Sequence, residues 1–206
     1  MTLATALIAY IGAAGLLTVT PGLDTAMVLR AAAVEGPRRA SLAALGIVCG
    51  CLAWGLAVAL GLGVLLAASQ AAYVALKWAG AAYLAWLGLN LILKPRSRFD
   101  LTTPRTDRRG NWWVRGFLTN LLNPKVGVFY VSFLPQFVPA HAPMAPFICL
   151  LAAIHAGLGV TWFAALTAAT SPLKRWLQRP AAVRWLDRMT GVVFLGFGAR
   201  LALDRR

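Results

Sequence analysis

The sequence predicts an all-α membrane protein of six transmembrane helices, arranged as two inverted three-helix repeats whose first spans are broken by proline. Hydrophobic residues make up 60% of the 206-residue chain and charged residues 13%, whereas a water-soluble domain is about 45–50% apolar. A bilayer core needs roughly 20 mostly apolar residues per helix. Three long stretches carry no Asp, Glu, Lys or Arg, and they are 1–23, 40–76 and 126–173.

The first expected helix, at about residues 3–32, is interrupted by Pro21 and Gly22. Proline removes a backbone donor and glycine permits dihedrals outside the helical range, so the helix should break here and restart near Leu23. The second uncharged stretch is long enough for two spans. The two expected helices, and the polar pair that divides them, are 40–68, 71–93 and Ser69–Gln70.

The fourth expected helix, at about residues 112–135, is interrupted by Pro124. Asn123 is a good N-cap and Pro124 suits the first helical position, so one helix should end here and another begin. Closely spaced prolines between Pro135 and Pro143 then separate this span from a fifth helix. In the sixth helix, arginines flank a short uncharged core and extend towards the headgroups. The fifth and sixth helices are expected at about 145–170 and 184–203.

The basic residues predict the orientation in the membrane. Fifteen of the 20 Lys and Arg residues fall in or beside the connections that follow the first, third and fifth helices. Such residues are enriched in cytoplasmic loops. We therefore expect these connections inside the cell and both chain termini outside. The chain forms a single transmembrane domain (1–206), made of a first repeat, a basic cytoplasmic loop and a second repeat at 1–93, 94–111 and 112–206.

Two likenesses between the halves predict an internal duplication. The third and sixth helices share a pattern of a basic residue, a glycine, an aromatic residue and a leucine, and the first and fourth helices are both broken by proline. Three spans per half is an odd number, so duplicated halves would insert with opposite orientations. Inverted repeats of this kind are typical of transporters, with the binding site near the interrupted helices. The matching residues are Lys77, Gly80, Tyr83 and Leu84 in the third helix, and Arg188, Gly191, Phe194 and Leu195 in the sixth.

Asp24 is an ionisable residue inside the first hydrophobic region. A helix that restarts near Leu23 presents free N–H groups that attract anions, and an intramembrane carboxylate is costly and usually functional. Asp24 is therefore a candidate for handling a proton or a substrate amine. The alternative is that Asp24 only caps the second half of the helix.

Lys125 places a cation in the middle of the fourth helix, where an ammonium group needs a partner. The candidates are Asp24, a substrate carboxylate and local carbonyl groups. We expect the two helix breaks to meet, with Asp24 and Lys125 facing one cavity, and the alternative is a purely structural ion pair. The candidate substrate-binding residues are Thr20, Pro21, Gly22, Asp24, Asn120, Asn123, Pro124 and Lys125.

Other features have less specific roles. His155 in the fifth helix is a candidate for proton coupling together with Asp24, and a satisfied buried histidine is the alternative. Gly46 and Gly50 form a pair of small residues that allows helices to pack closely. Tryptophans near the expected span ends suit interfacial anchoring. These tryptophans are Trp112, Trp113, Trp176 and Trp185.

Other functional classes lack the residues that they need. The net charge of +14 comes from short segments between apolar runs, which argues against nucleic-acid binding. The three cysteines lie in apolar runs without a metal-type partner set. The two His and six acidic residues are not clustered as a membrane enzyme would require. We expect no cofactor, no metal and no catalytic residue.

Short motifs along most of the chain form an ordered set. They are Thr20-Pro21-Gly22, the pattern from Lys77 to Gly88, Gly116-Phe117 followed by Asn120 to Lys125, and Leu134-Pro135-Gln136-Phe137. Taken in this order, they resemble the LysE/RhtB superfamily of bacterial amino-acid exporters, and chain length and span number agree. One position departs from the pattern, because Leu23 stands where the family commonly has a second proline. The first break then depends on Pro21 and Gly22 alone.

The resemblance implies a secondary transporter in the bacterial inner membrane, which exports an amino acid or a derivative as an antiporter coupled to proton influx. The expected partners are an amino-acid substrate and the lipid bilayer, and assembly into a homo-oligomer is left open. A passive channel or another small-solute transporter is the alternative, since broken spans occur in channels too. A protein that only packs or assembles would leave the mid-span charges of Asp24 and Lys125 unexplained.

Overall fold

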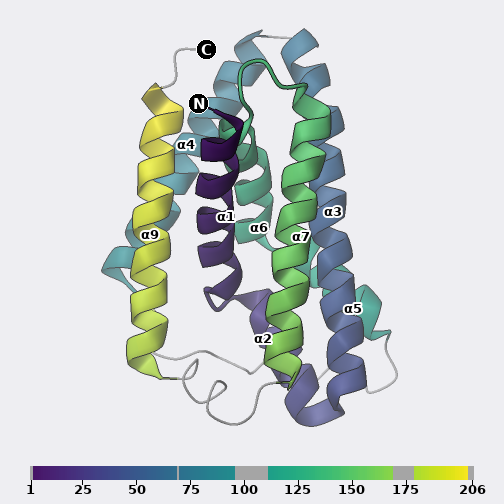
Figure 1. Ribbon diagram of the computed structural model, residues 1–206. Coiled ribbons are helices and arrows are strands. Elements are labelled where there is room, and N and C mark those ends of the chain that lie inside the picture. Colours follow the sequence, from purple (N-terminus) through teal and green to yellow (C-terminus); the bar gives the residue numbers. More distant parts are fainter. Residues whose placement is uncertain (1, 69, 96–110, 169–178, 204–206) are drawn as a thin grey trace.

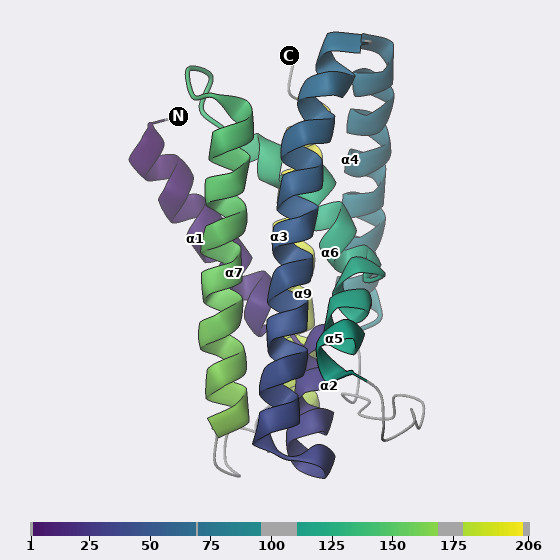
Figure 2. The ribbon, with the colours of Figure 1, turned by 90° about the vertical axis from the view of Figure 1, so that its right-hand side faces the viewer.

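The computed structural model describes residues 2–68, 70–95, 111–168 and 179–203, and every regular element in these ranges is helical. The long helices form an upright bundle with α6 between them and α5 at its edge (Figure 1), and α1 is inclined to the others (Figure 2). The elements are α1 (Leu3–Val19), α2 (Leu23–Arg30), η1 (Ala31–Glu35), α3 (Pro37–Ala68), α4 (Gln70–Leu93), α5 (Trp112–Leu121), α6 (Pro124–Val128), η2 (Phe129–Phe133), η3 (Leu134–Phe137), α7 (Met144–Ala168) and α9 (Pro180–Leu203).

Two segments among the described residues are each long and apolar enough to cross a membrane on their own. They are Pro37–Gly61 of α3 and Met144–Ala168, which is α7, and each has 25 residues. The pair α1 and α2 adds a third span if it is taken as one broken helix, because the two pass the same test together and meet at a bend of 52°. An all-helical membrane fold is therefore confirmed, whereas the six-span inverted arrangement stays a prediction.

Both predicted breaks in the helices are present. The first separates α1 from α2 at Pro21, and the second separates α5 from α6 at Pro124. The last helix begins at Pro180 rather than near residue 184, because proline is well suited to the first turn of a helix. The chain also forms π-helical turns in η1 and η2, which no pattern in the sequence predicts.

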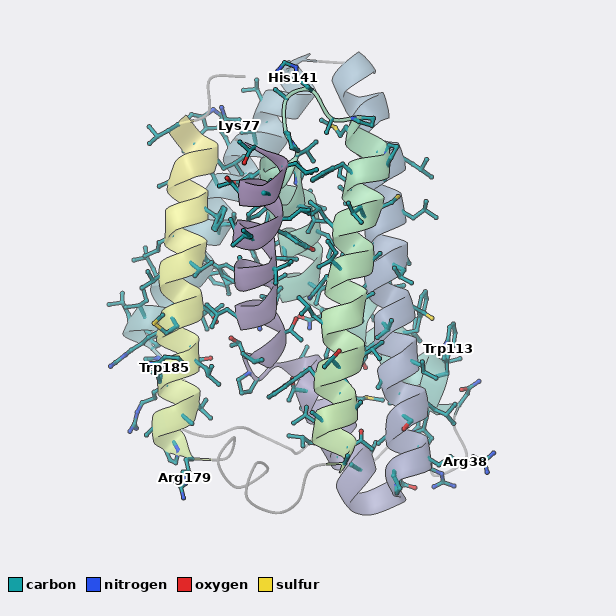
Figure 3. The ribbon with its side chains drawn as sticks, in the orientation of Figure 1. Arg38, Lys77, Trp113, His141, Arg179 and Trp185 are labelled. Atoms are coloured by element: carbon teal, nitrogen blue, oxygen red, sulfur yellow. The ribbon has the colours of Figure 1, made fainter. Side chains whose placement is uncertain are left out.

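The connections alternate between the two ends of the bundle. The corner between α2 and α3, the end of α7 and the start of α9 lie at the lower end in Figure 1, while α1 begins and α9 ends at the upper end. The end of α4 and the start of α5 lie in the lower half of the bundle. Arg38 and Arg179 lie at the lower end, which we call the basic end, and Lys77 and His141 lie at the other (Figure 3). Most of the predicted loop at 94–111 is outside the described residues.

Glycines bring α4 and α9 into direct contact. A Cβ on Gly88 would lie 2.8 Å from the carbonyl oxygen of Gly191, and a Cβ on Gly191 would lie 2.7 Å from that of Gly88. Further along, a Cβ on Gly198 would lie 3.1 Å from the carbonyl oxygen of Ala81, so the two helices run antiparallel. Of the two glycines in the motif shared by the third and sixth predicted helices, Gly191 lies in this contact, whereas Gly80 faces Ser132 of η2.

Gly46 and Gly50 have the packing role that the sequence predicts. A Cβ on Gly46 would lie 2.0 Å from the carbonyl oxygen of Trp113, and a Cβ on Gly50 would lie 2.6 Å from the side-chain oxygen of Asn120. The backbones of α3 and α5 can approach this closely because neither glycine carries a side chain. This contact places Asn120 at the level of the helix breaks.

The tryptophans have different environments. Trp185 is 56% exposed and Trp113 is partly exposed, and both lie towards the basic end (Figure 3), as interfacial anchors do. Trp112 is buried in an apolar cluster with Val28 and Ile47. It is therefore a core residue rather than the anchor that its position near a span end predicted. Trp176 lies outside the described residues.

A second and larger apolar cluster lies on the other side of the helix breaks. Its centre is a group of rings, which we call the aromatic cluster. The ring centroid of Phe133 lies 4.0 Å from that of Phe197 and 4.8 Å from that of Phe129, and Tyr10 and Phe137 are 5.2 Å apart. The aromatic cluster therefore joins α1, η2, η3 and α9 on the side of the breaks away from the basic end.

Candidate functional site

The break in the first span leaves carbonyl groups that Lys125 binds. In an uninterrupted helix the N–H of residue 21 would bond to the carbonyl of Leu17, but Pro21 has no N–H. The ammonium group of Lys125 donates to the carbonyl oxygens of Leu17 and Thr20, at 3.3 Å each. A cation at this end of α1 also offsets the negative end of the helix dipole. Local carbonyl groups, one of the predicted alternatives, are therefore among its partners.

The carboxylate of Asp24 accepts hydrogen bonds from two side-chain amides of the second break. The Nδ2 atom of Asn120 donates to one carboxylate oxygen at 2.8 Å, and that of Asn123 donates to the other at 3.4 Å. The N-cap residue of α2 is Gly22, and it makes no side-chain capping bond. Asp24 is therefore not the N-cap of α2, and it has partners outside its own helix.

Asn123 connects the two breaks through one side chain. Its oxygen accepts from the N–H of Lys125 at 3.1 Å, so it is the N-cap of α6, and Pro124 lies in the first turn, as the sequence predicts. Its amide nitrogen faces Asp24. The start of α6 is thus capped by a side chain, whereas the start of α2 is not. Of these two helix starts, that of α2 is therefore the one suited to binding an anion.

One cavity lies where the two breaks meet. It has a volume of about 50 Å³ and is lined by Asp24, Lys125 and His155, which leaves room for a few water molecules. The expectation that Asp24 and Lys125 face one cavity therefore agrees with the geometry. Thr20, Gly22 and Asn123 also line this cavity, whereas Asn120 is fully buried behind Asp24 and Pro21 lies at the first break.

His155 lies in the part of the cavity wall that α7 forms. Its ring is buried, and its Nδ1 atom lies 2.9 Å from the hydroxyl of Tyr130. The ring also packs at a tilt on Phe129, with centroids 5.2 Å apart. One ring nitrogen is thus satisfied while the residue faces the cavity. Both interpretations of His155, structural and proton-coupling, agree with this position.

Thr190 of α9 joins the site although no sequence motif marks it. Its hydroxyl lies 2.5 Å from that of Thr20, which in turn lies 2.6 Å from the carbonyl oxygen of Leu16. Both threonines are buried. The signal in the sequence is a hydroxyl residue inside the short uncharged core of the sixth helix. Through this pair, the last helix of the chain is attached to the break in the first span.

Known proteins resemble this chain over nearly its full length. Residues 15–205 match the LysE type translocator family. A homoserine/homoserine lactone efflux protein of Salmonella typhi is 30% identical over 96% of both chains. A threonine efflux protein of Escherichia coli (strain K12) is 27% identical over 90% of this chain and 92% of its own. An uncharacterized membrane protein, YrhP, of Bacillus subtilis is 29% identical over 96% of this chain and 99% of its own.

No solved structure matches this chain significantly. The family match and the near-complete coverage of the relatives agree with the ordered motifs at the two breaks. Translocators and efflux proteins move solutes and are not enzymes. This chain belongs to the LysE family of translocators.

Proposed function

We propose that this chain exports an amino acid or an amino-acid derivative from the cytoplasm, in exchange for protons, through one alternating-access site at the two helix breaks. Export of an amino acid is supported by the relatives that are named as homoserine/homoserine lactone and threonine efflux proteins. The observation that carries the proposal is the shared cavity, in which a carboxylate, an ammonium group and an imidazole meet. These are groups that recognise a zwitterion and move a proton.

The substrate carboxylate binds to Lys125 and to the start of α2. In the present structure the ammonium group of Lys125 donates to neutral carbonyl groups at 3.3 Å. A carboxylate is a stronger acceptor for this group than a carbonyl oxygen, because it carries a full negative charge, and hydrogen bonds between an ammonium group and a carboxylate are short and strong. The N-terminal N–H groups of α2, which no side chain caps, add a second attraction for the same anion.

The substrate amine and the coupling proton compete for Asp24. Its carboxylate faces the cavity and is held in place by Asn120 and Asn123. The carboxylate binds either an ammonium group or a proton, but not both. One of them must therefore leave before the other can bind. This competition couples the export of the amine to proton influx. His155, which lies in the cavity wall formed by α7, passes the proton to and from Asp24.

The basic end of the bundle faces the cytoplasm in this proposal, because Lys and Arg are enriched on that side of membrane proteins. The helices then form six spans in two inverted repeats, which the paired breaks and the glycine contact between α4 and α9 support. On the outer side of the cavity, the aromatic cluster fills the path. In this proposal, export requires these rings to separate.

The first prediction tests this proposal with purified protein in proteoliposomes under an imposed pH gradient, with threonine and homoserine as probes. We expect saturable exchange that the gradient drives. Asp24→Asn should abolish the response to the gradient, and Lys125→Met should weaken the apparent affinity by about 10- to 100-fold, since a hydrogen bond to a charged group contributes about 1.5–3 kcal/mol. Matched controls are Glu35→Gln and Lys94→Met, which remove a carboxylate and an ammonium group outside the cavity.

Two outcomes would contradict this proposal. If the flux of every amino acid tried is unaffected by Asp24→Asn and by Lys125→Met, the shared site is wrong. A flux that neither saturates nor responds to the pH gradient would instead show a passive channel.

A further inference from the structure

An apolar groove runs along the surface of the bundle between α3 and α7, which lie side by side in Figures 1 and 2. Its volume is about 210 Å³, and a cavity of about 150 Å³ already admits a benzene-sized molecule. The lining residues are spaced three and four apart, so they share one face of each helix. They are Ser41, Ala44, Leu45 and Val48 of α3, and Val160, Phe163, Ala164 and Thr167 of α7.

The groove and the central cavity share a wall. Val48 and Phe163 line both spaces. A Cβ on Gly159 would lie 3.8 Å from a side-chain atom of each of them, so both side chains lie beside this glycine. The ring of Phe163 is buried. It therefore separates the groove from the cavity that holds Asp24 and Lys125.

The two spaces are complementary in chemistry. The cavity holds charged groups but only about 50 Å³, whereas the groove has four times that volume and an apolar lining with hydroxyls only at its lower end, from Ser41 and Thr167. Its outer rim is half open to the membrane, since Leu45 is 51% exposed and Val160 is 48% exposed. A molecule with a zwitterionic head and an aliphatic tail matches this pair of spaces.

We propose that the groove between α3 and α7 is the subsite for the apolar side chain of the substrate, which reaches it from the cavity past Phe163. The exporter then selects amino acids or derivatives that carry an aliphatic tail. This inference rests on the proposed function, because Asp24 and Lys125 hold the head of the substrate. Since the groove opens to the bilayer, longer tails extend among the lipid chains instead of meeting a closed wall.

The second prediction is a dependence of affinity on chain length. The probes are straight-chain L-α-amino acids, from alanine through norvaline and norleucine to 2-aminooctanoate. Their affinity for the full-length protein is measured by competition with threonine exchange in proteoliposomes. We expect the affinity to rise about fourfold with each methylene, which is the gain for burying one such group. An affinity that stays level or falls along the series would overturn the proposal.

A matched pair of variants places the effect in the groove. Leu45→Trp fills the groove, and Leu56→Trp adds the same ring to α3 at a site that is 54% exposed and does not line the groove. The ratio of norleucine affinity to alanine affinity should fall at least tenfold in Leu45→Trp and stay at the wild-type value in Leu56→Trp. Equal ratios in the two variants would show that the tail binds elsewhere.

A measurement on the unaltered protein guards against misfolded variants. Photo-leucine, a diazirine analogue of leucine, should crosslink to peptides that contain residues 41–48 and 160–167. Crosslinks confined to other segments would contradict the assignment. A phospholipid that copurifies with the protein and is displaced by Leu45→Trp, together with a flat chain-length series, would make the groove a lipid site instead.

The same experiments separate this inference from the proposed function. If alanine and threonine are exchanged in a manner that depends on Asp24 and Lys125, but affinity does not grow with chain length, only the side-chain subsite is wrong. If no member of the series is transported, the proposed function fails, and the subsite fails with it.

Discussion

Asp24 and Lys125 each find partners in the other half of the chain. Lys125 belongs to the second break and binds the carbonyl groups released at the first, while Asp24 belongs to the first break and is bound by the amides of the second. Each break therefore supplies hydrogen-bond partners for groups of the other. Within a membrane, irregular backbone is tolerated only where protein or water forms hydrogen bonds with its free N–H and C=O groups. Here the side chains of Lys125 and Asp24 contribute hydrogen bonds that join the two breaks.

The third prediction concerns the amide that holds Asp24. Asn120→Ala removes the donor that lies 2.8 Å from one oxygen of the partly buried Asp24 carboxylate, and a hydrogen bond to a charged group contributes about 1.5–3 kcal/mol. We expect a lower temperature of thermal unfolding in detergent. The control is Asn90→Ala, because the side-chain amide of Asn90 donates to the carbonyl of Trp86 in its own helix. Equal shifts in the two variants would show that the amide on Asp24 does not stabilise the fold.

The sequence predicts the identity of the site residues better than their partners. The cap at Asn123 and the break at Pro21 follow from local chemistry, so they could be predicted from neighbouring residues. The bonds of Asp24 to Asn120 and Asn123 cross 96 and 99 residues. The contact of Thr20 with Thr190 crosses 170, and no local pattern indicates which distant side chain will approach.

At the scale of elements, the backbone path depends on where helices can touch. Both proline breaks lie where the sequence places them, but the π-helical turns of η1 and η2 do not follow from a residue type. In η2 the chain must pass close to α4, where a Cβ on Gly80 would lie 2.3 Å from the hydroxyl oxygen of Ser132. Whether such a segment forms an α- or a π-helical turn therefore depends on contacts with neighbouring helices, which local sequence does not indicate.

The fourth prediction tests the contact between α3 and α5. In Gly46→Ala the new Cβ would lie 2.0 Å from the carbonyl oxygen of Trp113, so one helix must move. Overpacking of this kind costs about 1–3 kcal/mol. The control is Gly61→Ala in the same helix, where nothing lies within 4 Å and alanine is favoured over glycine by about 0.5–1 kcal/mol. Thermal unfolding should show a loss for Gly46→Ala and no loss for Gly61→Ala; the reverse order would contradict the close contact.

At the scale of the whole molecule, hydropathy predicts the class of fold and the charges predict its orientation. Long uncharged stretches can be counted in any sequence, which is why the helical membrane fold could be predicted. The groove between α3 and α7 could not, because its lining is made of the same apolar residues that face lipid elsewhere on these helices. Only the relative position of the two helices distinguishes a groove from an ordinary lipid-facing surface.

The fifth prediction tests the orientation of the bundle in cells. Single cysteines replace Arg38 at the basic end and His141 at the other end, both exposed positions, in a chain from which Cys49, Cys51 and Cys149 have been removed. A membrane-impermeant maleimide should label His141→Cys in intact cells and Arg38→Cys only after permeabilisation, as expected if the basic end is cytoplasmic. Labelling in the opposite order would reverse the proposed direction of transport.

The hydrogen bond from Lys125 to Leu17 has a consequence for the synthesis and insertion of the protein. The two residues are separated by 108 positions, and chains are made from the N-terminus at about 5–20 residues per second. During synthesis, the first broken span is therefore complete several seconds before Lys125, whose ammonium group binds the carbonyl of Leu17, has been added to the chain. Until then its polar break must be held by water or by the insertion machinery, so the two halves of the protein reach their final form together.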